Sequence, residues 1–308
     1  MTNLTLPIFT DADKAREHLE AIRWPDGKPI CPHCGTVGEA TLVQGKSHRP
    51  GMFQCNACRE PFTVTVGTVM EKSHIPLNKW VLGFHLMSAS KKGISAHQLH
   101  RMLGVTYKSA WFMAHRIREA MAPAKNAGPL GGEGKVVEVD EVYTGQKKGA
   151  KKPRAGFAHK MAVVSLVERG GRARSFHVEF PDAFLVSDIV TDNVAPGSRL
   201  HTDESALYNR AGKSLKRETV NHSKDEYARG DVTTNSVEGF FSVFRRGMIG
   251  TYQHVSEQHL HRYTAEFDFR HSNREALGVN DAARAAKAVK GAEGKRLTYH
   301  QANGSRAA

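Results

Sequence analysis

Apolar residues recur at helical spacing in the first half of the chain. Residues 11–22 carry one apolar stripe that begins after acidic residues, as at the start of a helix. Residues 95–121 show the same period, interrupted by Gly104, as in two helices joined by a turn. The pattern predicts an N-terminal helix within residues 1–25 and a helix-turn-helix-like region within residues 75–122.

The second half of the chain has a strand pattern. Residues 135–143 are rich in valine, which predicts a strand buried on both faces. The runs 159–167 and 172–180 read as a hairpin, and shorter extended pieces are expected at 198–203 and 220–224. With helices between and after these strands, the pattern predicts an α+β or α/β domain.

A later helix carries a wide apolar stripe with charges at its border. Its apolar positions follow the i, i+3, i+4, i+7 spacing of a face that points into a core; they are Val237, Phe240, Phe241 and Phe244. Glu238 and Arg245 lie seven residues apart, so they project in similar directions from the edge of this stripe. An acid and a base there are compatible with phosphoryl transfer, or with a capping acid and a surface arginine.

Composition separates these regions from one another. The stretch 123–134 is rich in Pro and Gly and reads as a linker. It divides an N-terminal binding half from a C-terminal domain over residues 135–278. The final segment, residues 279–308, is rich in Ala and Lys and reads as a basic tail with a marginal helix that gives way to disorder.

Charge narrows the class of partner. The 308 residues carry 44 Lys and Arg against 31 Asp and Glu, a formal net charge of +13. Such an excess attracts polyanions, nucleic acid first and anionic membrane second. No apolar run reaches the ~18 residues that a membrane span needs, and the first residues lack signal-peptide architecture. We therefore expect a cytoplasmic, nucleoid-associated protein with no membrane partner.

All four cysteines lie in two C-x-x-C pairs, Cys31/Cys34 and Cys55/Cys58, with twenty residues between the pairs. Two such knuckles flanking short strand-like pieces predict a zinc ribbon over residues 26–70, with tetrahedral structural Zn²⁺. A redox dithiol is the alternative, which two pairs and the intervening strands disfavour. Four thiolates leave no open position on the metal, so the predicted site is structural.

The helix-turn-helix-like region has two interpretations. A short helix, a glycine turn and a longer helix with Lys108, Arg116 and Arg118 suit a reader of the DNA major groove. An ordinary helical hairpin is the alternative. A basic loop over residues 147–154 in the second half either contacts phosphates or is simply solvated.

Three acids are candidates for a catalytic centre. Asp140 interrupts the valine-rich strand, where a carboxylate is costly unless it is paired or holds a cation. Asp203 ends a later strand, and Glu238 lies on the following helix. Asn235-x-x-Glu238 is also a capping-box pattern, so this pair has a purely structural alternative. Carboxylates from different elements are what a two-metal site requires, and Arg245 suits a DNA phosphate.

Several segments together resemble a known family. The zinc ribbon, V-E-V-D-E-V-Y, H-T-D-E-S-A-L-Y, V-N-H-S-K-D-E-Y-A-R-G-D and T-N-S-V-E-G-F-F-S-V-F-R-R-G-M-I-G-T-Y are similar to the ISXO-like zinc-ribbon transposases of bacterial insertion sequences. The resemblance spans roughly residues 14–273. It implies a ribonuclease-H-like DDE domain that depends on Mg²⁺ or Mn²⁺, with terminal inverted repeats and target DNA as double-stranded substrates.

The resemblance also implies roles for particular residues. Asp140 and Asp203 match the two family aspartates. Glu238 matches the third metal position, for which Asn235 competes because the family position varies among Glu, Asn and His. Arg245 stands where the family usually has lysine.

These features together predict a DNA transposase, which we expect to act as a homo-oligomer on DNA. Two alternatives remain at this point. One is a zinc-ribbon and helix-turn-helix regulator with an inactive C-terminal domain, and the other is a nuclease of the same fold that does not transfer strands.

Overall fold

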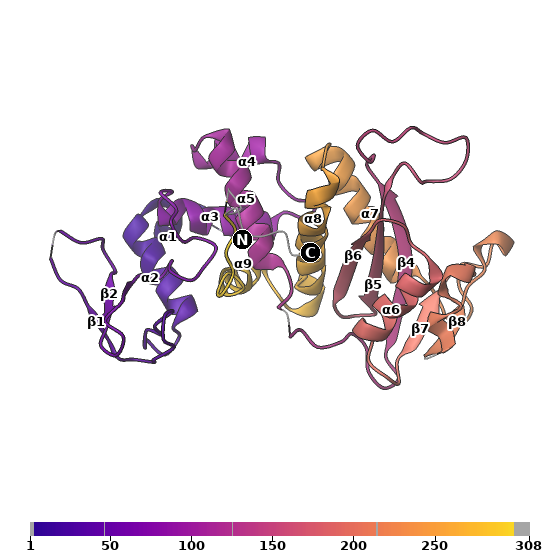
Figure 1. The fold of residues 1–308 in the computed structure, drawn as a ribbon, viewed down its shortest axis with the longest axis horizontal. Coiled ribbons are helices and arrows are strands. Elements are labelled where there is room, and N and C mark those ends of the chain that lie inside the picture. The colour runs from indigo at the N-terminus through magenta and orange to yellow at the C-terminus, as the bar shows by residue number, and fades with distance from the viewer. Residues whose placement is uncertain (1–2, 46, 125, 214, 299–308) are drawn as a thin grey trace, which may run out of the picture. The chain divides into compact units, whose positions relative to one another are not determined.

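The computed structural model describes residues 3–45, 47–124, 126–213 and 215–298 (Figure 1). The chain forms two compact units. The first unit comprises Met1–Ser90, Ile94–Met121 and Asn280–Ala308, and the second comprises Lys91–Gly93 and Ala122–Val279. The second unit is therefore inserted between segments of the first. No helix in the described ranges is long and apolar enough to cross a bilayer.

The first unit contains a small antiparallel sheet of short strands. Its order is β1-β2-β3, with β1 at Ala40–Leu42, β2 at Phe53–Cys55 and β3 at Pro61–Phe62. Trp24 packs edge-on against Phe53, whose ring stacks on Phe62 at 5.7 Å between centroids. Three aromatic rings thus form most of the apolar centre of this sheet, which is too small to be stable on that basis alone.

Helices form the rest of the first unit. They are α1 (Pro7–Thr10), α2 (Ala12–Arg23), α3 (Leu77–Ala89), α4 (Ala96–Leu103), α5 (Tyr107–Met121) and α9 (Asp281–Lys290). Helix α3 packs against α2, α5 and α9 and buries residues on most of its circumference. This explains its high content of large apolar side chains. The α2 helix begins where the Asp11 carboxylate accepts the backbone N–H groups of Asp13 and Lys14.

The turn between α4 and α5 fits the predicted helix-turn-helix pattern, but the predicted DNA-contacting arginines do not. Gly104 ends α4 with a φ of 58°, the left-handed conformation that glycine adopts readily. Arg116 is buried and donates to the carbonyls of Glu71 and Leu297, and Arg118 is also buried. Both guanidinium groups therefore lie inside the first unit and not on its surface. Lys108, near the start of α5, is exposed.

The second unit is built on a mixed sheet of order β6-β5-β4-β7-β8. The strands are β4 (Val136–Thr144), β5 (Met161–Glu168), β6 (Ala173–Val178), β7 (Arg199–Thr202) and β8 (Lys216–Thr219). Pairing is antiparallel among β4, β5 and β6 and parallel among β4, β7 and β8. Counted along the chain, this is the 3-2-1-4-5 order of the ribonuclease-H-like fold, with β4 at the centre.

Helices cover both faces of this sheet. Val137 and Val139 of β4 face a core that includes α6 (Ala183–Asn193). Val142 faces the opposite core, formed with α7 (Asn235–Gly247) and α8 (Leu260–Ser272). Because side chains alternate along a strand, Glu138 and Asp140 share the face of Val142. Glu138 and Asp140 therefore lie on the α7 side of the sheet.

Short helical turns connect these elements. They are η1 (Ala206–Tyr208), η2 (Ala211–Lys213), η3 (His222–Lys224), the π-helical η4 (Met248–Tyr252), η5 (Glu257–His259) and η6 (Glu275–Leu277). The extended piece expected at residues 220–224 is wrong in place and type: the strand is β8 at Lys216–Thr219, and His222–Lys224 is 3₁₀. The Glu204 carboxylate accepts the N–H groups of His222 and Ser223, so these two backbone donors are satisfied without pairing to a neighbouring strand.

Two segments that composition sets apart are packed into the units. Leu130, in the expected linker, is buried in the α6-side core and bridges to Val194. In the expected tail, α9 packs against α3 and buries Ala288 and Val289. Composition does not reveal such docking, because small and basic residues are equally common in solvated segments. Residues 299–308 of the tail lie outside the described part.

Gly247 on α7 provides a test of how closely α7 and α8 pack. A Cβ added there would lie 2.4 Å from the Phe267 ring and 2.6 Å from the Lys92 carbonyl oxygen. Gly247→Ala should destabilise the second unit by about 1–3 kcal/mol through overpacking. Gly239→Ala on the same helix, where a Cβ meets nothing within 4 Å, should instead stabilise by about 0.5–1 kcal/mol. Thermal unfolding followed by circular dichroism measures both, and equal midpoints would contradict this packing.

Candidate active site and metal centre

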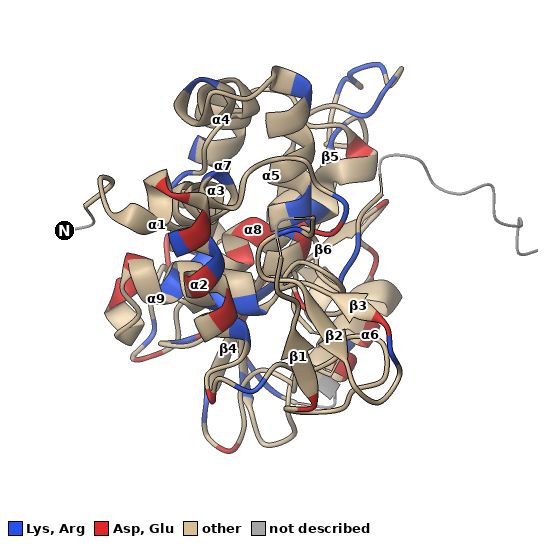
Figure 2. Ribbon diagram, turned by 90° about the vertical axis from the view of Figure 1, so that its left-hand side faces the viewer, with Lys and Arg blue, Asp and Glu red and all other residues tan. Residues whose placement is uncertain are grey.

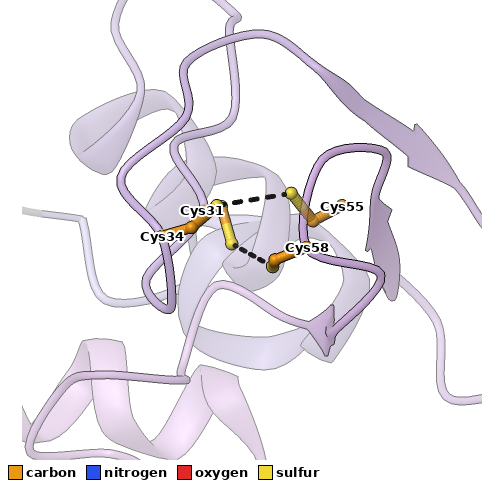
Figure 3. Close-up of side chains that lie close together, drawn as sticks. All are labelled: Cys31, Cys34, Cys55 and Cys58. Atoms are coloured by element: carbon orange, nitrogen blue, oxygen red, sulfur yellow. Dashed lines mark hydrogen bonds between the residues drawn. The ribbon is translucent and has the colours of Figure 1, made fainter.

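The four cysteine thiols converge on one point in the first unit (Figure 3). Their Sγ atoms all lie within 4.8 Å of one another, and the pairs Cys31/Cys58 and Cys34/Cys55 are each 3.7 Å apart. A tetrahedral ion with Zn–S bonds of about 2.3 Å requires S···S edges of about 3.8 Å. The donor set and its spacing therefore fit a zinc ion.

The two knuckles have the same backbone construction. The N–H of Gly35 donates to the carbonyl of Cys31 at 2.9 Å, and the N–H of Arg59 donates to that of Cys55 at 3.0 Å. Gly35 and Arg59 both have positive φ, 78° and 64°. Each turn therefore closes just after its second cysteine and directs both thiols to the same side, which is what the C-x-x-C spacing predicts.

A second polar cluster lies at one edge of the central sheet of the other unit. Glu138 of β4 pairs with His201 of the parallel strand β7. Asp140 and Asp203 each follow this pair by two residues. Asp203 lies just past the end of β7, and Asp140 lies midway along β4, where the Asp203 carboxylate helps to raise its pKa. This edge is where open α/β sheets place functional groups.

The carboxylates at this edge carry uncompensated negative charge. Burial raises the pKa of Asp140 to about 7, and the carboxylates of Glu141, Asp203 and Glu238 add to the increase. Burial also raises the pKa of Asp203, against opposing contributions from the Ser205 N–H and from nearby cationic groups. Each of these shifts is in the direction that a bound cation would reverse. Oxygen donors of this kind suit a hard divalent cation such as Mg²⁺.

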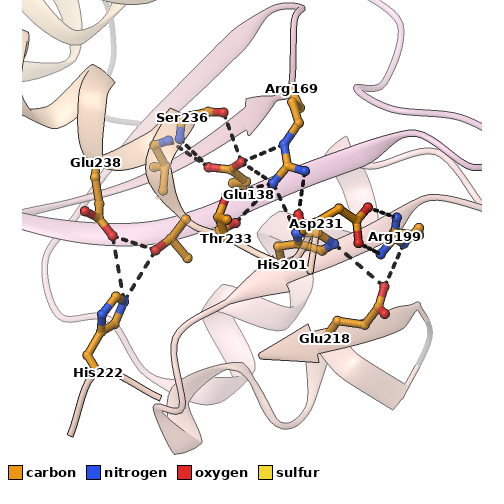
Figure 4. A network of polar contacts seen from close by, with 12 residues as sticks. Glu138, Arg169, Arg199, His201, Glu218, His222, Asp231, Thr233, Ser236 and Glu238 are labelled. Carbon is orange, nitrogen blue, oxygen red and sulfur yellow. Dashed lines mark hydrogen bonds and ion pairs between the residues drawn. The ribbon is translucent and has the colours of Figure 1, made fainter. Parts of the chain in front are cut away.

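Glu238 projects from the first turn of α7 toward this edge. Its Oε1 accepts the Thr234 hydroxyl at 2.6 Å and lies 3.7 Å from Nε2 of His222 (Figure 4). The side chain is half exposed, at 47%. Its charge contributes to the raised pKa of Asp140, so it belongs electrostatically to the same cluster.

The capping-box alternative for Asn235 and Glu238 is wrong. Thr234 is the N-cap residue and Asn235 is the first residue of the helix, exposed to solvent. The N-terminus of α7 is instead capped by the carboxylate of Glu138, which accepts the N–H groups of Ser236 and Val237. A distant carboxylate thus takes the place of the local cap.

The structure brings some of the expected residues together more closely than others. Within the described ranges, the only group of three or more acidic, cysteine or histidine side chains close enough to hold one ion is the cysteine set. Asp140, Asp203 and Glu238 therefore gather at one edge without forming a closed ligand shell. Arg245 is exposed two helical turns beyond Glu238.

Three neighbours of these acids were not assigned from the sequence. His222 lies beside Glu238 and lowers the pKa of Asp203. Arg169 binds Glu138, and Tyr208 donates its hydroxyl to Glu141 on the opposite face of β4. A buried acid in a valine-rich strand signals that a partner exists, but partners about 30 and 70 residues away are visible only in the fold.

Comparison with known proteins assigns these features to a family. Residues 129–272 match the ISXO2-like transposase domain, and residues 10–60 match the transposase zinc-ribbon domain. A Halobacterium salinarum protein described as an uncharacterized protein in transposable element ISH50 is 28% identical over 302 residues, covering 89% of this chain and 97% of its own.

Two solved structures overlap weakly. One is from a simian T-cell lymphotropic virus intasome in complex with PP2A regulatory subunit B56 gamma, with 12% identity, a TM-score of 0.29, and coverage of 56% of this chain and 63% of that chain. The other is from a pre-cleavage Mos1 transpososome, with 12% identity, a TM-score of 0.26, and coverage of 63% and 70%. These scores are too low to add to the argument from topology.

A cysteine-ligated ribbon joined to a ribonuclease-H-like domain defines the class of zinc-ribbon DNA transposases. The two matched domains together span more than half of the chain, which belongs to the ISXO2-like transposases of insertion sequences.

The pKa of Asp140 gives a test of the acidic edge, the part of the sheet where Asp140, Asp203 and Glu238 lie. Its folded value of about 7 exceeds the ordinary aspartate value of 3.8, so the folded state binds more protons between these pH values. The stability that protonated Asp140 contributes is therefore lost as the pH rises from about 4 to about 7. Without divalent cations, Asp140→Asn should stabilise the second unit more at pH 8 than at pH 5, by about 1–3 kcal/mol.

Urea unfolding at the two pH values measures this difference. Asp188→Asn, at an exposed position of α6 in the same unit, is the matched control and should show no such pH dependence. Identical behaviour of the two variants would mean that Asp140 does not titrate in a crowded acidic site.

Proposed function

We propose that this transposase binds the ends of its insertion sequence and catalyses metal-dependent cleavage and transfer of DNA strands. The observation that carries the proposal is the gathering of Asp140, Asp203 and Glu238 from three different elements at one edge of a ribonuclease-H-like sheet. Family membership supports the reaction class.

Asp140 and Asp203 are proposed to hold the catalytic Mg²⁺ or Mn²⁺, with Glu238 as the third acid. Asn235 remains the competitor for that position, since it is exposed three residues earlier on the same helix. Their carboxylate oxygens are the donors that Mg²⁺ prefers, and the uncompensated charge at Asp140 favours a cation. When bound, the metal ions would stabilise the charge that develops on the attacking and leaving oxygens.

The reaction is proposed to be two in-line displacements at phosphorus. Water attacks the phosphodiester at an element end, the P–O3′ bond breaks, and a 3′-hydroxyl is freed. That hydroxyl then attacks a target phosphodiester and displaces a new 3′-hydroxyl. Arg245, exposed on α7 beyond Glu238, is placed to hold a backbone phosphate during these steps.

DNA contacts are proposed for both units. In the first, the start of α5 with exposed Lys108 is the part of a helix-turn-helix that reaches base edges. In the second, the loop that follows β4 carries exposed Lys148, Lys151, Lys152 and Arg154 (Figure 2, blue). This loop follows the strand that bears Asp140, and we propose that its positive charges attract the DNA backbone. We propose that two or more chains act together, one at each DNA end.

The catalytic assignment is tested on duplex DNA that contains the genomic sequence flanking the gene. Asp140→Asn should retain binding to this DNA in a mobility-shift assay and lose Mg²⁺-dependent nicking by at least about 100-fold, because the cation loses a ligand. Asp188→Asn is the control and should cleave like the wild type. Mapping the nicks and joined products separates transfer from simple hydrolysis, and an unchanged cleavage rate in Asp140→Asn would remove Asp140 from the site.

The zinc assignment has its own test. Elemental analysis of the purified chain should find one zinc per chain, lost when Cys31 or Cys58 is replaced by Ser, because a tetrahedral site needs all four thiolates. His33→Asn, an exposed position inside the first knuckle, should keep the metal. A well-folded wild-type chain without zinc would overturn the ribbon assignment.

A further inference from the structure

Glu138 is a second buried acid on β4, and the reaction proposed above gives it no part. Its residue is 0% exposed, and it lies two positions before Asp140 on the same face of the strand. Burying an unpaired carboxylate here would cost folding free energy. The groups that pair with Glu138 therefore indicate its role.

One set of partners is the start of α7. The Glu138 Oε2 atom accepts the backbone N–H groups of Ser236 at 2.7 Å and Val237 at 3.0 Å, and Oε1 accepts the Ser236 hydroxyl at 2.9 Å (Figure 4). Glu238 is the next residue along the helix. The negative charge also interacts favourably with the positive end of the helix dipole. One carboxylate thus joins the strand of Asp140 directly to the turn that bears Glu238.

The other partner is Arg169, which follows β5. Its Nη2 and Nε atoms donate to Glu138 Oε1 at 2.8 and 3.1 Å. The same guanidinium donates to the carbonyl oxygens of Asp231 and Thr233 and to the Thr233 hydroxyl. Arg169 therefore attaches the segment that leads into α7 to the same carboxylate.

A further ion pair attaches this segment to β7. The Asp231 carboxylate receives two hydrogen bonds from Arg199, at 2.5 and 3.0 Å. Residues 231–237 are thus tied to β4, to the end of β5 and to β7, the strand that leads to Asp203. Hydrophobic packing of α7 sets its distance from the sheet, but these directional bonds set its rotation and its position along the strand.

We propose that Glu138, held by Arg169, is a positioning residue that sets the separation of Glu238 from Asp140 and Asp203 and thereby tunes affinity for the catalytic divalent cation. The inference rests on the proposed function, and it assigns Glu138 no contact with DNA. It predicts that loss of the Glu138 charge changes metal affinity, whereas a merely structural buried ion pair would change stability alone.

The test compares Glu138→Gln with Glu266→Gln. Glu266 is also 0% exposed, pairs with Arg270 within α8 and accepts the Tyr252 hydroxyl. It is a buried Glu–Arg pair in the same unit that involves neither β4 nor α7. Mn²⁺ is titrated into each zinc-loaded full-length protein by calorimetry, and nicking rates are measured against Mg²⁺ concentration.

Glu138→Gln should weaken Mn²⁺ binding and raise the half-saturating Mg²⁺ concentration by about 10- to 100-fold, while DNA binding stays unchanged. Glu266→Gln should lower the unfolding midpoint and leave both metal measurements at wild-type values. Equal metal affinity in Glu138→Gln and wild type would overturn the proposal, as would an equal loss in both variants.

Two further variants keep the outcome interpretable. If Glu138→Gln does not fold, the double variant Glu138→Gln/Arg169→Gln leaves no buried charge unpaired and should show the same shift in metal affinity. Asp140→Asn reports on the proposed function separately. If it still cleaves, the proposed function fails, whereas normal metal affinity in the Glu138 variants beside an inactive Asp140→Asn rejects only the positioning role.

Discussion

The second unit depends on one constraint, which is that its central strand carries two carboxylates on the face that packs against α7, one buried and one half-buried. Strand β4 is apolar on both faces, yet Glu138 and Asp140 occupy successive positions on the α7 side. Each is tolerated for a different reason. Glu138 is satisfied by Arg169 and by the start of α7, whereas Asp140 is left with other acids and an elevated pKa. The hydrogen bonds of Glu138 hold α7 in place. The raised pKa of Asp140 means that a nearby cation would stabilise its charged form.

The first unit meets the opposite difficulty, which is a shortage of core. Its ribbon has strands of two or three residues and an apolar centre of a few aromatic rings. Four thiols held within 4.8 Å of one another supply a site whose metal-binding free energy would become folding free energy. The thiols of this unit thus form a site that fits a zinc ion, whereas the acids of the other unit are proposed to hold a catalytic cation.

Local chemistry in the sequence predicted most of what the fold contains. The valine run, the C-x-x-C spacing and the apolar stripe of α7 each depend on neighbours along the chain, so periodicity and turn chemistry were sufficient. Several local interpretations failed where a distant group supplied a hydrogen bond. Asn235 and Glu238 match a capping box, but Glu138 caps α7. Residues 220–224 look extended, but Glu204 accepts two N–H groups of a 3₁₀ turn at His222–Lys224. Arg116 resembles a DNA contact, but its buried side chain donates to the backbone carbonyls of Glu71 and Leu297.

The return of α9 to α3 has a consequence for the order of events during synthesis. Because residues 122–279 are inserted within the first unit, the helix that completes that unit, α9, is synthesised only after the whole inserted segment. A copy of the gene interrupted near its 3′ end would therefore retain every residue of the acidic edge and lose the closure of the zinc-ribbon unit.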